Sequence, residues 1–267
     1  MSSNSNIIAL TMGDPSGVGT EIAIRAKIKK IKKPDFFIIH DIDFVKKILK
    51  KMKSKLKVRE ISSPSEVKKL PKNYLAVLPI KISKNTQLGK KNLSNVKSIL
   101  ASIDLAVKLA KNGEVAAIVT NPINKDVIGK KVKNFKGHTE YLAKKDRTND
   151  QLMMMMNKNL KTIPLTTHIA INKVSNKINK KNIIKAIINA NVSLRKDFKI
   201  KKPRIAVTAL NPHAGDGGLI GDDEKVKILP AIKYCKKKKI SVEGPLPADS
   251  AFIKNNQNKY DIFICMF

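Results

Sequence analysis

Short, almost continuously apolar runs alternate with helical stretches along the chain, and this alternation limits its fold more than any other feature. Such runs are typical of strands buried on both faces of a parallel sheet. They occupy residues 7–11, 36–40, 74–80, 115–120, 151–156, 162–167, 204–210 and 260–266. Helices are predicted from about residue 20 and over 93–113, 181–195 and 222–238. The order of strand, loop and helix predicts an α/β fold with mostly parallel sheets.

Two lobes are expected from the length of the chain. With 267 residues and 42% apolar content, one or two sizeable cores can be buried. We place a first α/β lobe at residues 1–125 and a second at 126–267. No apolar run approaches the about 20 residues that a membrane-spanning helix needs. Cys235 and Cys265 form no paired-thiol motif, so neither a disulfide framework nor a thiolate zinc site is indicated, and a cytoplasmic location is expected.

The formal charge of +33 raises the question of nucleic-acid binding, because a large positive field attracts polyanions. The lysines, however, are spread along the whole chain, and aromatic residues make up only 4% of it. A nucleic-acid surface usually adds arginine forks and stacking aromatics. A basic protein that binds nucleic acid without enzymatic activity is therefore the least favoured class, and it predicts steeply salt-dependent binding to RNA or DNA.

Polar loops follow several of the predicted strands, where ligands gather in parallel sheets. The loops read "TMGDPSGVGTE" after the first strand, "TNPINK" after the fourth, "TTH" after the sixth and "NPHAGDGGLIGDDE" after the seventh. His138, His168 and His213 lie in loops or at strand ends, and neutral imidazoles are common metal ligands. For each histidine, ligation and an ordinary hydrogen-bonded role both stay open.

The glycine-rich segments have more than one interpretation. "GDPSGVG" is compatible with an anion held at the start of a helix and with a plain tight turn. "GDGGLIG" lacks the spacing of a dinucleotide fingerprint. Asp222, Asp223 and Glu224 are predicted to stabilise a helix N-terminus. The run Met153 to Met156 is expected in the core of a strand rather than in a metal-binding methionine group.

Six segments occur in one order over nearly the whole chain: "TMGDPSGVGTE", "TNPINK", "FKGHTEYL", "LTTHIA", "LNPHAGDGGLIGDDE", and "GPLPADSAF" followed by "YDIFICMF". This set resembles the NAD-dependent 4-hydroxythreonine-4-phosphate dehydrogenases of vitamin B6 biosynthesis. The resemblance implies two α/β/α lobes of the isocitrate and isopropylmalate dehydrogenase type. It also implies a homodimer with its active site at the subunit interface, NAD as cofactor, and a divalent metal such as zinc, magnesium or cobalt.

The resemblance also implies roles for individual residues. His138 and Thr139 match the substrate-binding pair of the family, and His168 and His213 match two of its three metal ligands. Asp249 is expected to orient a ligand or to move a proton, and Lys125 to contact phosphate or substrate. For both, a structural salt bridge or turn is the alternative.

The implied reaction is oxidation of the secondary hydroxyl of 4-phosphooxy-L-threonine by hydride transfer to NAD. The resulting β-keto acid loses carbon dioxide and gives 3-amino-2-oxopropyl phosphate. A Lewis-acid metal suits both steps, because it lowers the pKa of a bound hydroxyl and stabilises negative charge on the ketone oxygen. A related dehydrogenase of a phosphorylated hydroxy acid, of the threonate or erythronate type, is the alternative.

The carboxyl end departs from the family pattern. In the family the final strand leads into a His-Asp pair that supplies the third metal ligand, whereas this sequence stops at Phe267. We therefore expect the C-terminal part to be missing, with weak or absent metal binding and an incomplete first lobe, and an inactive remnant is a further alternative.

Overall fold

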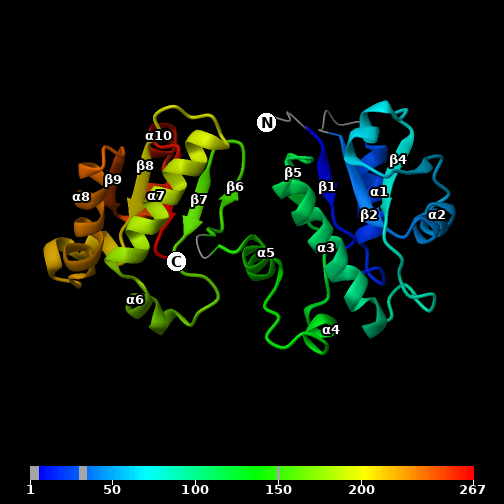
Figure 1. The fold of residues 1–267 in the computed structure, drawn as a ribbon. Helices are drawn as coiled ribbons and strands as arrows, with labels where there is room; N and C mark the ends of the chain where they lie inside the picture. Colours follow the sequence, from blue (N-terminus) through cyan, green and yellow to red (C-terminus); the bar gives the residue numbers. More distant parts are fainter. Residues whose placement is uncertain (1–5, 30–34, 149–150) are drawn as a thin grey trace. The chain divides into compact units, whose positions relative to one another are not determined.

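The computed structural model describes residues 6–29, 35–148 and 151–267 (Figure 1). The chain divides into two compact units, residues 1–149 and 150–267. Within the described residues, each unit contains a five-stranded sheet. Each unit is described by itself below.

The sheet of unit 1 is entirely parallel and has the strand order β3-β4-β2-β1-β5. Its strands are β1 (Ile8–Leu10), β2 (Phe36–His40), β3 (Lys57–Glu60), β4 (Tyr74–Pro79) and β5 (Ala117–Val119). The α-helices of the unit are α1 (Gly19–Ile28), α2 (Ile42–Lys51), α3 (Val96–Lys111), α4 (Lys125–Gly129) and α5 (His138–Asp146). Short 3-10 helices lie at Pro64–Lys69 and Leu93–Asn95.

Helices cover both faces of this sheet. Successive side chains of a strand point to opposite faces, and in β2 Phe37 and Ile39 join one buried cluster while Ile38 joins another. The first cluster contains Ala106 and Leu109 of α3, and the second contains residues of α1 and α2. Both faces of the sheet are therefore apolar and covered by helices. This explains why the strand sequences are continuously apolar.

The sheet of unit 2 has the order β6-β7-β10-β8-β9, with β6 antiparallel and the other strands parallel. Its strands are β6 (Met155–Met156), β7 (Lys161–Pro164), β8 (Ile205–Thr208), β9 (Val242–Leu246) and β10 (Ile262–Cys265). The α-helices are α6 (Val174–Lys177), α7 (Lys180–Lys196), α8 (Leu229–Lys237), α9 (Ala248–Ala251) and α10 (Lys254–Lys259). Shorter turns lie at Ile171–Lys173 and Pro212–Gly218 (3-10) and at Glu224–Ile228 (π).

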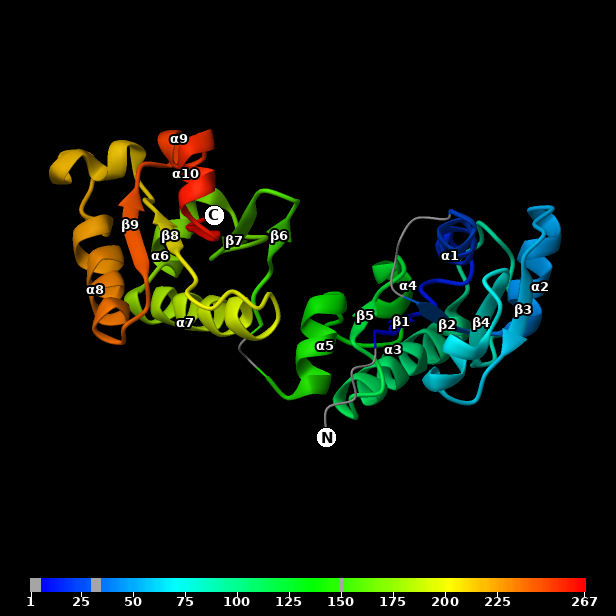
Figure 2. The same cartoon turned by 90° about the horizontal axis from the view of Figure 1, so that it is seen from above.

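The central strand β10 again divides its side chains between two cores. Ile262 and Ile264 pack with α7 and α8, and Phe263 packs with Ala251 and Tyr260 on the other face. Figure 2 shows α7 along one face of this sheet and α9 and α10 on the opposite face. Both units are thus α/β/α layers, and the predicted fold class is confirmed.

The structure groups residues 126–149 with unit 1, whereas we placed the boundary after residue 125. The reason is the packing of α5 on α3. Tyr141 of α5 donates a hydrogen bond to Asp104 Oδ1 over 2.8 Å, and Lys145 Nζ lies 2.6 Å from Asp104 Oδ2.

The prediction that the methionine run lies in a strand core is wrong. Only Met155 and Met156 form a strand, at the edge of the sheet, and they are 55% and 59% exposed. Among the described residues, no helix is long and apolar enough to span a membrane.

Candidate active site

The loops after β1 and β5, "TMGDPSGVGTE" and "TNPINK", are joined by hydrogen bonds beyond the carboxyl ends of these strands. Asp14 N–H donates to the Pro122 carbonyl over 2.8 Å, and Asn121 Nδ2 donates to the Thr11 carbonyl over 3.0 Å. Gly13 has a φ of +70°, and a Cβ there would lie only 2.7 Å from Asn121 Cβ and from the Pro122 carbonyl oxygen. A side chain at Gly13 therefore has neither the backbone conformation nor the space that it needs.

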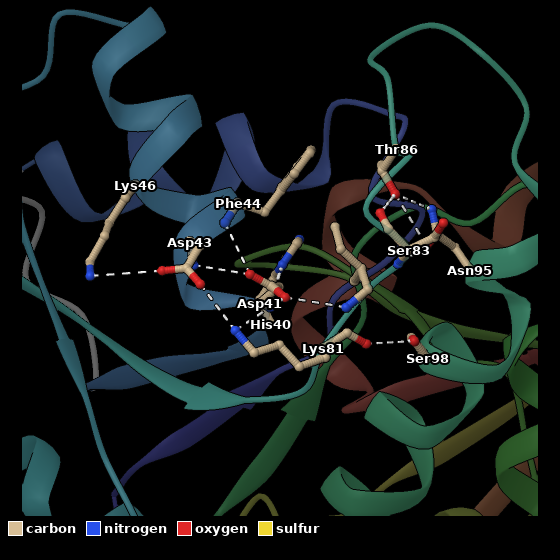
Figure 3. A network of polar contacts seen from close by, with 11 residues as sticks. His40, Asp41, Asp43, Phe44, Lys46, Lys81, Ser83, Thr86, Asn95 and Ser98 are labelled. Carbon is tan, nitrogen blue, oxygen red and sulfur yellow. Dashed lines mark hydrogen bonds and ion pairs between the residues drawn. The ribbon is translucent and has the colours of Figure 1, made fainter.

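His40, the fourth histidine, is a fully buried structural residue at the end of β2 (Figure 3). Its Nδ1 accepts the Asp41 N–H over 2.7 Å, so the proton of the neutral ring is on Nε2, which faces Thr20 Oγ1 at 3.0 Å. The ring also stacks on Phe44. Burial lowers the pKa of His40 from 6.5 to about 4. His40 thereby connects the first turn of α1 to the end of β2 as a neutral group.

Asp41 joins α2 to the loop that follows β4. Its Oδ1 accepts the N–H groups of Asp43 and Phe44 over 3.0 and 3.1 Å, which caps α2. Its Oδ2 accepts the Ile82 N–H over 3.3 Å, and Lys81 Nζ lies 3.9 Å from it. Figure 3 shows this network beside the hydrogen bonds among Ser83, Thr86 and Asn95. These contacts fix the polar end of the sheet, and their buried member Asp41 acts as a structural group.

Lys125 and His138 come together in unit 1. They are the first residues of α4 and α5, and a Cβ on Gly137 would lie 3.4 Å from Lys125 Nζ. Within the described part of the chain, His138 Nε2 is buried and has no hydrogen-bond partner. Burial and then the positive charge of Lys125 lower the pKa of His138.

This cluster has the properties of an anion site. Thr139, in the first turn of α5, is exposed, and the N–H groups at a helix N-terminus attract negative charge. The ammonium group of Lys125 adds a positive charge beside them, although the carboxylate of Glu140 lies in the same turn, with its Oε2 3.6 Å from the position of a Gly137 Cβ. Three of the predicted residues, Lys125, His138 and Thr139, are thus neighbours in one unit.

The remaining predicted residues follow strands of the second sheet. His168 comes after β7, His213 after β8 and Asp249 after β9, and β10 lies between β7 and β8. His213 Nδ1 lies 3.2 Å from Asp249 Oδ2, and their side chains are 70% and 55% exposed. Among the described residues, His168 forms no hydrogen bond or ion pair with either. The structure therefore pairs His213 with Asp249 and leaves His168 outside that pair.

His213 lies in a loop with an unusual backbone. The five residues His213, Ala214, Gly215, Asp216 and Gly217 all have positive φ, between 42° and 79°. For residues other than glycine this conformation costs on the order of 1 kcal/mol each, so the surroundings must hold it in place. We call residues 213–217 the left-handed loop.

Glu224 lies in the first turn of a helical segment, with Asp223 at the N-cap, as the sequence predicts, and it also binds the residues just before the left-handed loop. It begins a π-helical turn and is only 3% exposed. Its Oε1 accepts the N–H groups of Leu210 and Asn211 over 2.9 and 2.8 Å, and its Oε2 accepts from Asn211 Nδ2 over 3.0 Å. Sequence reasoning missed this contact, because only the folded loop brings residues 210 and 211 to the carboxylate.

The donor types present suit a divalent metal only in part. Imidazole nitrogens and carboxylate oxygens are common ligands of zinc, and His168, His213 and Asp249 provide both. In the described part of the chain, however, no three histidine, cysteine or acidic side chains are grouped so that they could hold an ion. The described residues therefore do not complete a metal site by themselves.

Comparison with known proteins gives one family. A family model described as pyridoxal phosphate biosynthetic protein PdxA matches residues 32–267. The 4-hydroxythreonine-4-phosphate dehydrogenase of Pseudoalteromonas translucida is 31% identical over 97% of this chain and 78% of its own length. That of Sulfurihydrogenibium sp. is 33% identical over 97% and 79%.

The solved structures agree with the family model. The crystal structure of 4-hydroxythreonine-4-phosphate dehydrogenase from Klebsiella pneumoniae has a TM-score of 0.92 at 32% identity, and covers 98% of this chain and 81% of that chain. The expected family is therefore confirmed. This chain belongs to the PdxA family of pyridoxal phosphate biosynthetic proteins, whose similar curated members are enzymes named 4-hydroxythreonine-4-phosphate dehydrogenase.

Proposed function

We propose that this protein oxidises 4-phosphooxy-L-threonine with NAD and that the product then loses carbon dioxide to give 3-amino-2-oxopropyl phosphate. The observation that carries the proposal is the cluster of Lys125, His138 and Thr139 in a chain of this family. The cluster combines a cation, a helix N-terminus and an imidazole nitrogen without a partner. Such a cluster suits a small phosphorylated substrate.

We assign roles to these residues as follows. Lys125 and the N–H groups at the start of α5 bind an anionic group of the substrate. His138 is held neutral by burial and by Lys125, so its Nε2 is able to exchange a hydrogen bond with a substrate hydroxyl or phosphate oxygen. Thr139 adds a hydroxyl group to the same end of α5.

Asp249 and His213 form a second group of proposed functional residues, within unit 2. The distance of 3.2 Å between Asp249 Oδ2 and His213 Nδ1 allows the carboxylate to orient the imidazole. In the oxidation a hydride leaves the carbinol carbon for NAD and the hydroxyl proton leaves for a base, and Asp249 is our candidate for that base. His168 and His213 remain proposed ligands of a divalent ion such as zinc, magnesium or cobalt.

The proposal includes the assembly and the location of the enzyme. We propose a cytoplasmic homodimer whose active site lies at the subunit interface. Both cysteines are free thiols in the structure, which is consistent with a reducing compartment.

The experiment that tests the proposed function compares three substrates. Purified protein is incubated with NAD, a divalent metal and either 4-phosphooxy-L-threonine, 4-phospho-threonate or 4-phospho-erythronate, and formation of reduced nicotinamide is followed. We expect the largest kcat/KM for the amino acid. Higher kcat/KM with a hydroxy acid would assign the chain to the related dehydrogenases, and absence of turnover with all three would refute the proposal.

A further inference from the structure

We propose that Glu224 is a positioning residue: it fixes the backbone around His213, so that the imidazole of His213 faces the carboxylate of Asp249. Glu224 acts through the chain before and after His213 rather than by touching the imidazole. The role of this arrangement in catalysis rests on the proposed function. The positioning of His213 by Glu224 does not depend on it.

The first observation is that Glu224 is buried and binds the backbone just before His213. Glu224 is 3% exposed, and taking a carboxylate out of water is costly unless hydrogen bonds compensate. It accepts three, from the N–H groups of Leu210 and Asn211 and from Asn211 Nδ2, over 2.8 to 3.0 Å. Hydrogen bonds to a charged acceptor are stronger than those to a neutral one. The carboxylate therefore holds the backbone two residues before His213.

The second observation is contact with the loop after His213. A Cβ at Gly215 would lie 2.7 Å from Glu224 Oε2 and 2.8 Å from the Gly221 carbonyl oxygen. Gly215 is also buried and has a φ of +79°. Glu224 therefore lies against both flanks of His213, at residue 211 and at residue 215, and leaves space only for a glycine at the second position.

Two sequence neighbours of Glu224, Asp223 and Lys225, bind residues before and after His213. Asn211 Nδ2 lies 3.4 Å from Asp223 Oδ2, and Lys225 Nζ donates to the Gly217 carbonyl. Asp223 is itself held by Ser175 Oγ at 2.9 Å and by an ion pair with Lys227. Asp223 and Glu224 thus hold Asn211 before the loop, and Lys225 contacts its last residue, Gly217. Glu224 and Lys225 belong to a π-helical turn, a conformation that is frequent at functional sites.

These contacts explain how the left-handed loop persists. His213, Ala214 and Asp216 hold a conformation that residues other than glycine avoid. Without the carboxylate, Leu210 and Asn211 lose the acceptor of their N–H groups, and the loop is free to return to ordinary backbone angles. The imidazole of His213 then no longer faces Asp249, because both side chains are exposed and their orientation depends on the backbone that carries them.

The test compares Glu224→Gln, Glu224→Ala and a matched control, Glu243→Gln. Glu243 is another hydrogen-bonded carboxylate of unit 2, but its partners are Lys259 and Tyr260 rather than the loop. The primary measurement is the chemical shift of the His213 ring protons, recorded by NMR at one fixed pH. The chain has only four histidines, so a His213→Asn sample identifies the signal.

We expect Glu224→Ala to shift the His213 signal and to leave the signals of His40 and His138 unchanged. Glu224→Gln should recover part of the shift, because the glutamine oxygen still accepts the N–H groups of Leu210 and Asn211 while its amide group faces Asn211 Nδ2. In the activity assay kcat should fall on the order of tenfold to a hundredfold with Glu224→Ala, with the KM for NAD little changed. Glu243→Gln should match the wild type in both measurements.

The outcomes separate this proposal from the proposed function. A His213 signal in folded Glu224→Ala that equals the wild type overturns the positioning role. If Glu224→Ala does not fold, an unshifted His213 signal in Glu224→Gln overturns it in the same way. The two proposals also fail separately. If Glu224→Ala shifts the His213 signal but the wild-type protein shows no turnover, Glu224 remains the positioning residue and only the dehydrogenase proposal is refuted.

Discussion

At the scale of single residues, the most informative feature is that the two predicted clusters differ in burial. Lys125 and His138 meet at the starts of two helices, where His138 Nε2 is enclosed, while His213 and Asp249 meet in the open. Both pairs consist of residues that the sequence singled out as candidates, but neither distance follows from sequence spacing. Each pair is brought together by the layered fold.

Replacing Lys125 by methionine tests the first cluster. Methionine keeps much of the length of the side chain and removes the charge, so we expect the KM for the phosphorylated substrate to rise on the order of tenfold with a smaller change in kcat. The pKa of His138 should rise toward its ordinary value, because the charge of Lys125 contributes to lowering it. NMR titration measures the second effect without turnover, and an unchanged pKa would contradict the contact.

His40 predicts a pH dependence of stability. Below pH 6.5 the unfolded chain binds a proton at this histidine, whereas the folded protein binds none until about pH 4. Acid therefore favours the unfolded state, and the free energy of unfolding should fall by up to about 3 kcal/mol between these values and be insensitive to His40 above them. Urea denaturation at several pH values measures the slope. The His40→Gln variant should lack this component, and equal slopes in both proteins would count against a neutral buried ring.

At the scale of elements, helix caps and loops rather than strands connect the fold to the site. Asp41 caps α2 and also holds the loop after β4. The Asp41→Ala variant should lose about 1 to 2 kcal/mol of unfolding free energy, measured by urea denaturation. Asp43→Ala is the matched control, because Asp43 is exposed and its ion pairs with Lys46 and Lys81 are solvated, so no measurable change is expected. Equal losses in the two variants would contradict the capping role.

The sequence predicted the buried elements better than the exposed ones. The strand expected at 36–40 is β2 with the same bounds, and the helix expected at 181–195 is α7, Lys180–Lys196. The strand β3 was missed because its sequence, "KVRE", is polar and mostly exposed at the edge of the sheet. Edge position also explains the wrong prediction for Met155 and Met156, because apolar composition does not reveal which strand lies at an edge.

The candidate site was predictable to the extent that it depends on strand ends. The loops after β1, β5, β7 and β8 were identified because parallel strands bring their carboxyl ends to one edge. Glu224 was not identified as a loop contact, since its burial depends on glycines that turn the chain back on itself. The local sequence of an acidic triplet before a helix is the same in both cases, whether its last residue only stabilises that helix or also binds a preceding loop.

At the scale of the whole molecule, two α/β/α units divide the predicted residues between them. Unit 1 contains the Lys125, His138 and Thr139 cluster, and unit 2 contains His168, His213 and Asp249. The charge of +33 is compatible with an anionic substrate but does not by itself select one.

The stoichiometry of the complete reaction tests whether the protein performs both the oxidation and the loss of carbon dioxide. Purified protein, NAD and 4-phosphooxy-L-threonine are incubated with a divalent metal, and reduced nicotinamide and carbon dioxide are quantified in the same sample. We predict equal amounts of the two products, and no formation of either when the substrate is omitted. Reduced nicotinamide without carbon dioxide, or neither product, would contradict the proposed oxidation and decarboxylation.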